Sequence, residues 1–356
     1  MKITGFVIIP LTILLAGASC QVQTPAPEAS TVEAPISAHE STEPPAQVQN
    51  VFINADNLAQ LEKTASLQAS TSALTCTWSS DSSKITIMDN THAGLYKAAS
   101  FTLLGEFTGD EYTALYAVSP DAGLAAYSLD GLKIQLYDFA TKTDRISITP
   151  DFQYGSVFFS PDGSHLAVDS LDKIEVVIYD TSTGAQIDNL SGFETAAPVY
   201  SAAFNNIGNY LVWISRGTVQ PMLIADQLLL PALSHEDFVA AVRMSHDNSW
   251  VATAAAGTLN GVMQPLVTVW YAPKGSVAWQ TGNAEYFSSL DFSPYDAMLA
   301  AGTKNEVVFY DVASGKELSR LHTGGDVINS LDFSPDGMSL LTCSTDGIAT
   351  IWEVIP

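Results

Sequence analysis

The chain repeats one short pattern at a nearly constant interval, and this repetition constrains its fold more than any other feature. The clearest copies read Phe-Ser-Pro-Asp-Gly and occupy residues 159–163 and 333–337. Steps of 40, 41, 45, 40, 48 and 41 residues separate seven copies, which begin at Trp78, Val118, Phe159, Phe204, Met244, Phe292 and Phe333. An interval of this size is typical of arrays in which each unit buries its apolar face against its neighbours.

Each unit has the same internal order of strands and turns. An apolar strand leads into the Ser-Pro-Asp-Gly turn, where proline fixes φ and Asp and Gly suit a tight corner. A second apolar strand follows, then an aromatic residue with an acidic neighbour, a hairpin turn and a last strand. Four strands joined by short turns form one blade of a β-propeller. The sequence therefore predicts an all-β fold, a seven-bladed β-propeller of four-stranded antiparallel blades.

The aromatic–acidic pairs carry a family resemblance. Tyr137-Asp138, Tyr179-Asp180, Tyr310-Asp311 and Trp352-Glu353 are similar to the Trp-Asp dipeptide of the WD-repeat β-propeller family, and the resemblance covers roughly residues 51–356. The family's Gly-His dipeptide is missing, with only His322 near the expected place. The resemblance therefore implies cohesion by apolar packing between blades rather than by the family's buried His–Ser–Asp–Trp network.

Two units depart from the pattern, and the ring needs closing. We expect the fourth unit (204–233) and the fifth, with a long loop over 258–265, to be the least regular. The seventh unit lacks a fourth strand after Trp352, whereas residues 59–67 resemble the outer strands of other units. We predict that 59–67 crosses over to complete the seventh blade, which removes exposed sheet edges at that point.

Two cysteines fall in neighbouring blades across this closure. Cys76 lies on the first strand of the first blade, and Cys343 lies on the second strand of the seventh. An oxidising compartment would permit a disulfide between them. Two separate buried thiols, acting as small apolar groups, are the interpretation that we prefer from the sequence.

The first twenty residues predict secretion. A short positive start is followed by an apolar run over 3–16 and the small residues 17–20, which is the order of a signal peptide. The run is too short to span a bilayer comfortably. Residues 14–20 resemble the lipobox of bacterial lipoproteins, and the resemblance implies cleavage before Cys20 and a diacylglycerol thioether on its sulfur. An ordinary signal peptide cut nearby, with Cys20 incidental, is the alternative.

The next segment predicts a tether. Residues 21–50 contain five prolines, four glutamates and no Lys or Arg, a composition that cannot bury enough apolar surface to offset the entropy of ordering. We therefore expect a signal peptide over 1–19, a lipidated cysteine and tether over 20–50, and the propeller over 51–356. The resulting location is the cell envelope, extracytoplasmic and membrane-anchored, at the outer membrane or cell surface.

Charge and motif spacing exclude several functions. The chain carries 14 Lys+Arg against 38 Asp+Glu, a net charge of −24, which disfavours nucleic acid as a partner. There is no zinc-binding His pair, nucleophile elbow, phosphate-cradling glycine loop or calcium loop. We therefore predict no enzyme activity, no cofactor and no metal. Four acids that could suggest paired catalytic carboxylates occupy the same turn in different units, and the turn explains them: Asp162, Asp247, Asp296 and Asp336. His235 and His246 also lie in turns, where we expect them to be solvated.

One group of loops rises above this background. In WD-repeat propellers the loops from the fourth strand into the next blade line the upper mouth of the channel, and six of the seven such loops here carry an acid. Aromatic residues in such a rim give contact area, and converging acids attract basic surfaces. The residues that we predict to contact a partner are Glu111, Tyr112, Asp151, Tyr154, Glu236, Asp237, Phe238, Glu285 and Tyr286.

These observations favour a binding protein. We expect a monomeric, lipid-anchored propeller that binds other proteins, including those with basic surfaces, and that touches the membrane only through its anchor. The alternatives are a hydrolase or lyase with its site in the central channel, because fold does not decide function, and a propeller that binds cations or carbohydrate at the acidic–aromatic rim.

Overall fold

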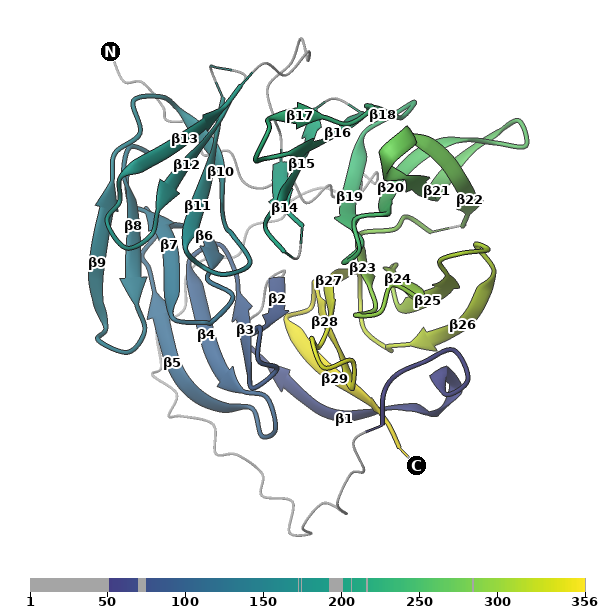
Figure 1. Cartoon of the computed structure of the whole chain (residues 1–356). Helices are drawn as coiled ribbons and strands as arrows, with labels where there is room; N and C mark the ends of the chain where they lie inside the picture. The colour runs from purple at the N-terminus through teal and green to yellow at the C-terminus, as the bar shows by residue number, and fades with distance from the viewer. Residues whose placement is uncertain are drawn as a thin grey trace, which may run out of the picture.

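A computed structural model describes residues 51–69, 75–171, 173, 175–191, 201–205, 207–215, 217–283 and 285–355. The described residues form seven antiparallel sheets arranged around a ring (Figure 1), which confirms the predicted seven-bladed propeller. The predicted signal peptide, Cys20 and the tether lie outside the described residues. No helix within the described part of the chain is both long and apolar enough to cross a membrane.

The first four blades follow one another in chain order, from β2 to β18. Blade one is β2 (Thr75–Trp78), β3 (Lys84–Met88), β4 (His92–Lys97) and β5 (Thr102–Thr108). Blade two is β6 (Ala114–Val118), β7 (Leu124–Ser128), β8 (Ile134–Asp138) and β9 (Thr143–Ile148). Blade three is β10 (Tyr154–Phe159), β11 (His165–Ser170), β12 (Val176–Asp180) and β13 (Gln186–Leu190). Blade four is β14 (Ser201–Phe204), β15 (Tyr210–Ser215), β16 (Thr218–Leu223), β17 (Leu228–Leu229) and β18 (Leu233–Ser234).

The remaining blades complete the circle, with one 3₁₀ turn in blade five and one before β1. Blade five is β19 (Val239–Met244), β20 (Trp250–Leu259), β21 (Val262–Tyr271), η2 (Ala272–Lys274) and β22 (Ser276–Gly282). Blade six is β23 (Ser289–Phe292), β24 (Met298–Gly302), β25 (Glu306–Asp311) and β26 (Glu317–His322). Blade seven is β27 (Ile328–Phe333), β28 (Ser339–Ser344) and β29 (Ile348–Val354), with η1 (Leu58–Gln60) and β1 (Leu61–Gln68) added from the N-terminal side.

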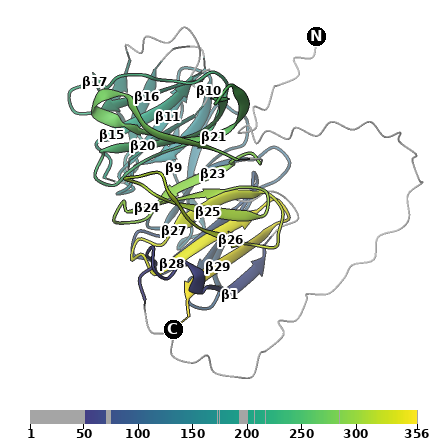
Figure 2. The ribbon, with the colours of Figure 1, turned by 90° about the vertical axis from the view of Figure 1, so that its right-hand side faces the viewer.

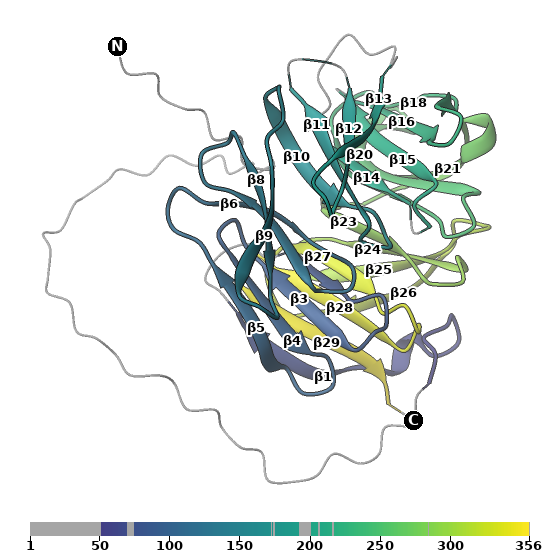
Figure 3. The ribbon, with the colours of Figure 1, turned by 60° about the vertical axis from the view of Figure 1, so that its left-hand side comes forward.

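The closure is as predicted. β1 pairs antiparallel with β29, with Leu61 opposite Val354 and Gln68 opposite Ile348. Figures 2 and 3 both show β1 beside β29. Ile53, Leu58 and Leu61 join the apolar cluster between blades six and seven, so the crossing segment is anchored by side chains as well as by backbone hydrogen bonds.

Apolar packing between neighbouring blades holds the ring together, as expected. Among the described residues there is a separate apolar cluster at every junction of two blades. At the junction of blades five and six, for example, Val267 and Val269 pack against Phe292, Leu299 and Tyr310. Because each blade buries both faces in this way, no blade has a complete core of its own.

The two cysteines correct our sequence-based preference. Cys76 on β2 and Cys343 on β28 form a disulfide, with their Cα atoms 6.0 Å apart. The prediction of two separate thiols was therefore wrong. β2 and β28 are neighbours in space across the junction of blades seven and one, although 267 residues separate the two cysteines in sequence. The disulfide is a second, covalent closure of the ring beside the β1 strand.

Blades four and five deviate from the pattern in different ways. In blade four the outer strand is divided into β17 and β18, which pair with different parts of β16. In blade five our prediction of a long loop over 258–265 was wrong. These residues continue β20 and β21 as a regular hairpin, with Leu259 opposite Val262. Asn260 and Gly261 have φ of 54° and 79°, as a two-residue type I′ turn requires.

The turns between the first and second strands of the blades share one backbone geometry. The residue that occupies the glycine position of Ser-Pro-Asp-Gly has positive φ in every blade, at Ser82, Ala122, Gly163, Gly208, Asn248, Asp296 and Gly337. In five blades the turn's serine hydroxyl also donates to the Asp two residues later, at 2.5–2.7 Å. Asp296 is an exception to our grouping of the turn acids, because it stands at the left-handed position instead.

Candidate functional site

The upper face of the propeller is defined by strand direction. In an antiparallel blade the loop that enters the first strand and the turn between the second and third strands lie at the same end. This end carries the predicted rim loops, and the Ser-Pro-Asp-Gly turns lie at the opposite, lower end. The N-terminal arm meets the lower face, since Ile53 donates its backbone N–H to Gly337 at 2.9 Å and Phe52 packs edge-on against Tyr295.

Several predicted rim residues are exposed on the upper face. Tyr112 is 71% exposed and Tyr286 is 62% exposed, and each follows an exposed glutamate, Glu111 and Glu285. Asp151 is also exposed and forms a 3.4 Å ion pair with Lys173, whose ammonium lies over the Phe152 ring. Glu111–Tyr112 lies in the loop between β5 and β6, and Glu285–Tyr286 lies in the loop between β22 and β23. Two acidic–aromatic pairs are therefore available to a partner.

Other predicted rim residues are part of the structure itself. Tyr154 is only 7% exposed and packs in the cluster between blades two and three, so it is not available to a partner. Phe238 is half-buried next to the exposed Asp237. The carboxylate of Glu236 accepts hydrogen bonds from the backbone N–H and hydroxyl of Thr258, at 3.1 and 2.8 Å. Glu236 therefore supports the β20–β21 hairpin.

The structure adds upper-face residues that sequence reasoning missed. Leu129 and Leu132 are exposed in the turn between β7 and β8, at the same end of blade two as the loop that carries Tyr112. Val262 and Met263 are exposed at the tip of the β20–β21 hairpin. The Asn-Gly dipeptide at 260–261 was the available signal for this hairpin, since it is the strongest short-range indicator of a two-residue turn.

A buried carboxylate lies beneath the blade-three part of the rim. Asp169 on β11 is fully buried, and its Oδ1 accepts the backbone N–H groups of Gly155 and Ser156 at the bulge of β10. Its Oδ2 has no hydrogen-bond partner among the described residues. Burial raises the pKa of Asp169 to about 6, against the two backbone N–H donors that lower it. Asp169 thus fixes the start of the innermost strand.

Polar residues also face one another on the innermost strands. Thr77, Arg243, Asp291 and Asp332 each precede the first residue of a repeat. Asp332 accepts the Thr77 hydroxyl at 2.7 Å and the Trp78 backbone N–H at 2.8 Å. Asp291 likewise accepts the Phe333 N–H at 2.8 Å and lies 4.0 Å from Arg243. Each carboxylate therefore joins its blade to the next one.

These two carboxylates have perturbed acidity. Burial and the charge of Asp332 raise the pKa of Asp291, and burial raises the pKa of Asp332. Sequence reasoning missed the pair because each residue alone resembles an ordinary strand residue before Phe-Ser-Pro. The signal was the recurrence of Asp at the same position in two consecutive repeats.

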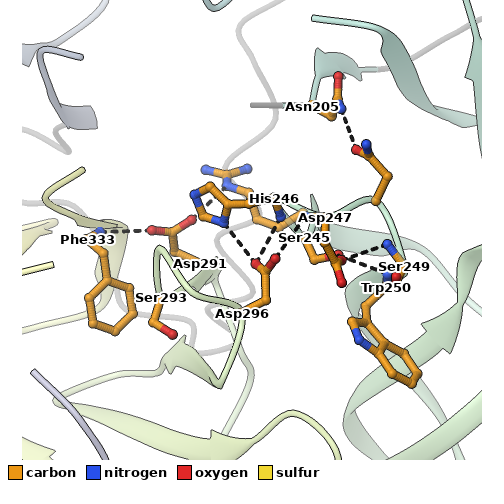
Figure 4. A network of polar contacts seen from close by, with 12 residues as sticks. Asn205, Ser245, His246, Asp247, Ser249, Trp250, Asp291, Ser293, Asp296 and Phe333 are labelled. Atoms are coloured by element: carbon orange, nitrogen blue, oxygen red, sulfur yellow. Dashed lines mark hydrogen bonds and ion pairs between the residues drawn. The ribbon is translucent and has the colours of Figure 1, made fainter. Parts of the chain in front are cut away.

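A second polar contact between blades five and six, beside Arg243–Asp291, joins His246 to Asp296 (Figure 4). The carboxylate of Asp296 lies 2.8 Å from the His246 Nδ1 and accepts the backbone N–H groups of His246 and Asp247, both at 2.9 Å. Burial alone would lower the pKa of His246, but the hydrogen bond and charge of Asp296 outweigh it and raise the pKa. His246 and Asp296 are thus an inter-blade pair, and the prediction of a solvated turn residue was wrong for His246.

His235 corrects a second expectation. Its Nε2 lies 2.9 Å from the Thr253 hydroxyl, which also accepts the Trp270 indole N–H at 2.9 Å. The His235 and Trp270 rings are 5.2 Å apart, and burial lowers the pKa of His235. Blade five therefore contains a His–Thr–Trp network resembling the one that we expected to be missing. In blade seven the Trp352 indole likewise donates to the Thr342 hydroxyl at 2.9 Å.

The described residues do not contain a group of three or more His, Cys, Asp or Glu side chains arranged to hold a metal ion. The carboxylates of Asp291 and Asp332 are instead bound to the backbone of the neighbouring blade. What this arrangement offers chemically is an acidic upper surface with exposed aromatic and aliphatic side chains, carried on a rigid ring.

Comparison with known proteins agrees with the fold. Residues 315–353 match the family described as WD domain, G-beta repeat. This segment covers β26 and most of blade seven. The matched segment and the seven blades together support a WD-repeat β-propeller.

Two relatives illustrate the similarity. The chain is 31% identical over 124 residues to the small ribosomal subunit protein RACK1 of Caenorhabditis elegans, covering 34% of this chain and 35% of that protein. It is 25% identical over 277 residues to the periodic tryptophan protein 2 of Arabidopsis thaliana, covering 68% of this chain and 29% of that protein. The matched stretches span about a third of each relative's own length.

Proposed function

We propose that this protein is a non-catalytic scaffold that binds other proteins on the upper face of its propeller. The observation that carries this proposal is the pair of exposed acidic–aromatic sites at Glu111–Tyr112 and Glu285–Tyr286. Exposed aromatic residues supply contact area, and a net charge of −24 attracts basic partners. The family match at residues 315–353 supports the same function.

We further propose that the protein is a lipid-anchored lipoprotein of the bacterial cell envelope. The signal-like run over 3–16 and Cys20 support this, and the Cys76–Cys343 disulfide suits an oxidising compartment. Because the N-terminal arm meets the lower face, a tether over 21–50 would present the upper face away from the membrane. Its reach would be up to about 100 Å. Replacement of Cys20 by Ala should abolish labelling by a palmitate analogue and release the protein from membranes.

The scaffold proposal is tested by affinity capture from native envelope extract with residues 51–356 as bait. A variant with Glu111→Lys, Asp237→Lys and Glu285→Lys reverses the upper-face charge without touching Glu236, which supports the hairpin. The control reverses as many exposed acids elsewhere, with Asp56→Lys, Glu62→Lys and Asp226→Lys. Proteins retained by the wild type and the control, but lost from the upper-face variant, support the scaffold. Equal retention by all three baits would refute an upper-face site.

A hydrolase with its site in the channel is the second candidate. The observation in its favour is the Asp291–Asp332 pair, whose raised pKa values are of the kind found at catalytic sites. Their hydrogen bonds to Phe333 and Trp78 give them a structural role, which is why we rank this function second. A panel of fluorogenic ester, glycoside and peptide substrates, tested with the wild type and Asp291→Asn, decides between them. Turnover that this substitution abolishes without lowering Tm would favour the enzyme.

The rim also leaves the binding of cations or carbohydrate as a further alternative. Calcium that binds the folded state would raise Tm, and above the Kd the rise would grow with the logarithm of the calcium concentration. The described part of the upper face offers acids in pairs rather than in a three-ligand group, so this alternative has less support than protein binding.

A further inference from the structure

The β20–β21 hairpin is longer than its blade needs. Both strands have ten residues, whereas the described strands of the other blades have two to eight. β19 pairs with β20 only as far as Ala255, and on the other side β22 pairs with β21 as far as Leu266, with one further hydrogen bond from Asn283 to Pro265. Residues 256–264 therefore extend past both neighbouring strands at the upper face.

This extension is a built structure. Its two-residue turn at Asn260-Gly261 is of the type that matches the twist of a hairpin. The Glu236 carboxylate binds the backbone and hydroxyl of Thr258, and the Gln264 side chain donates to the Leu259 carbonyl at 3.3 Å. A two-stranded hairpin is only marginally stable by itself. The Gln264 contact closes the hairpin on itself, and the Glu236 contacts hold it in one position relative to the blade.

The tip exposes apolar side chains that contribute little to the blade. Val262 is 60% exposed and Met263 is 58% exposed. Tyr286 is also exposed on the segment that follows β22, where Asn283 bonds to the base of the hairpin. Apolar side chains gathered at an exposed projection mark an interaction surface more often than scattered ones do.

The surroundings of the tip are acidic. Asp237 and Glu285 are exposed on the loops on either side of the hairpin, and Glu236 lies at its base. Residues 233–242 and 255–290 contain a single cation, Lys274, which lies at the far end of β21. A second copy of this chain, with its net charge of −24, would be repelled from such a surface.

We propose that this hairpin surface, formed by Val262, Met263, Tyr286, Asp237 and Glu285, docks a segment of a partner protein in which lysine or arginine alternates with large apolar residues. The apolar side chains contact the tip and Tyr286, and the cations lie against the two flanking acids. This inference rests on the proposed scaffold function and names the partner chemistry for one part of the upper face.

The probe for the test is a fluorescein-labelled peptide in which lysine alternates with valine and leucine. A charge-matched peptide with serine in place of valine and leucine reports attraction by charge alone. The tip variant is Val262→Ser with Met263→Ser. Its matched control is Ile187→Ser with Val277→Ser, because these two side chains are also exposed but lie on the outer strands of blades three and five. Fluorescence anisotropy gives the affinities, and thermal melting confirms that each variant folds.

We expect the tip variant to bind the apolar peptide about tenfold more weakly than the wild type and the control do. Binding of the serine peptide should be weak and equal for all of them. Asp237→Asn with Glu285→Gln should weaken binding and flatten its salt dependence. Unchanged binding by the tip variant, or equal binding of the two peptides, would overturn the proposal.

A second measurement avoids any dependence on variant folding. Hydrogen exchange of the unaltered protein with the apolar peptide should slow at residues 256–264 and 285–287, and protection confined to other blades would overturn the proposal. The result is separable from the scaffold proposal. Upper-face capture that persists when the peptide ignores the hairpin refutes only the hairpin surface. Failure of both experiments refutes the scaffold function itself.

Discussion

At the scale of single residues, carboxylates connect the blades of this protein and position its rim. Asp332 binds the first residues of blade one, Asp291 binds blade seven, and Asp296 binds the turn of blade five. Asp169 acts within a single blade, where it binds the backbone at the bulge of β10 in blade three. Each carboxylate accepts backbone N–H groups that would otherwise have no partner. An unpaired buried donor costs about 1–3 kcal/mol.

The His246–Asp296 pair predicts a pH dependence of stability. The folded-state pKa of His246 is raised by Asp296, so its stabilising effect is fully present below the unfolded value of 6.5 and is lost as pH rises through the folded value. His246→Gln should therefore destabilise the protein more at pH 6 than at pH 9, and Tm should fall accordingly. The two losses of unfolding free energy should differ by about 1 kcal/mol at most, because the ring is partly exposed. Thermal melting across this pH range is the measurement. Equal losses at both pH values would contradict the pairing.

Asp169 predicts a loss of stability with rising pH as well, but in a more acidic range. Its folded-state pKa of about 6 lies above the ordinary value of 3.8, so the folded state binds the proton more tightly and stability falls as pH rises from about 4 to 6. Asp169→Asn keeps an acceptor for Gly155 and Ser156 and removes the buried charge. Relative to the wild type, this variant should gain on the order of 2 kcal/mol between pH 4 and pH 7. Denaturant titrations at the two pH values measure it, and a constant difference between the proteins would count against the buried charge.

At the scale of elements, the order of strands and turns repeats faithfully while the links between elements differ. The turns after the first strand keep positive φ even where Ser82, Ala122 or Asp296 replaces glycine. In blade five the β20–β21 hairpin extends the blade, and in blade four the outer strand is divided. Between β2 and β28, a disulfide replaces the two free thiols that we expected.

The disulfide between β2 and β28 should contribute measurably to stability. Cys76→Ser with Cys343→Ser should reduce the free energy of unfolding by about 2–4 kcal/mol, because the bond constrains the unfolded chain across nearly its whole folded length. Reductant should lower the Tm of the wild type but not of the double variant. Intact mass after alkylation with and without reductant reports the bond directly. Alkylation of both cysteines in the native, unreduced protein would refute it.

At the scale of the whole molecule, the ring is held closed by two devices at one junction, the β1 strand and the Cys76–Cys343 bond. Apolar clusters hold the remaining junctions, together with the Asp291 and Asp296 contacts of blade six. Closure by β1 also protects the edge of the last sheet, because β29 without β1 would present unpaired backbone groups to other molecules.

Removal of the closing strand should therefore destabilise the whole propeller. A chain of residues 70–356 loses Ile53, Leu58 and Leu61 from the cluster between blades six and seven. Burial of three such side chains stabilises by about 5 kcal/mol, so we expect a marked fall in Tm compared with residues 51–356. Light scattering should show self-association through the free edge of β29. An unchanged Tm would mean that β1 is not needed for closure.

The sequence by itself determined the repeat, the number of blades, the turn chemistry and the closing strand, because each of these depends on a local period or on a short pattern of residue types. The β20–β21 hairpin could also have been predicted, from the dipeptide Asn260-Gly261, but the length of the unit suggested a loop. Only the tertiary structure decided that Cys76 meets Cys343, that Glu236 supports Thr258 and that Tyr154 is buried while Tyr286 is exposed. The physical reason is that these outcomes depend on which side chains from different parts of the chain meet when the blades pack. The spacing of residues along the chain does not determine which of them come into contact.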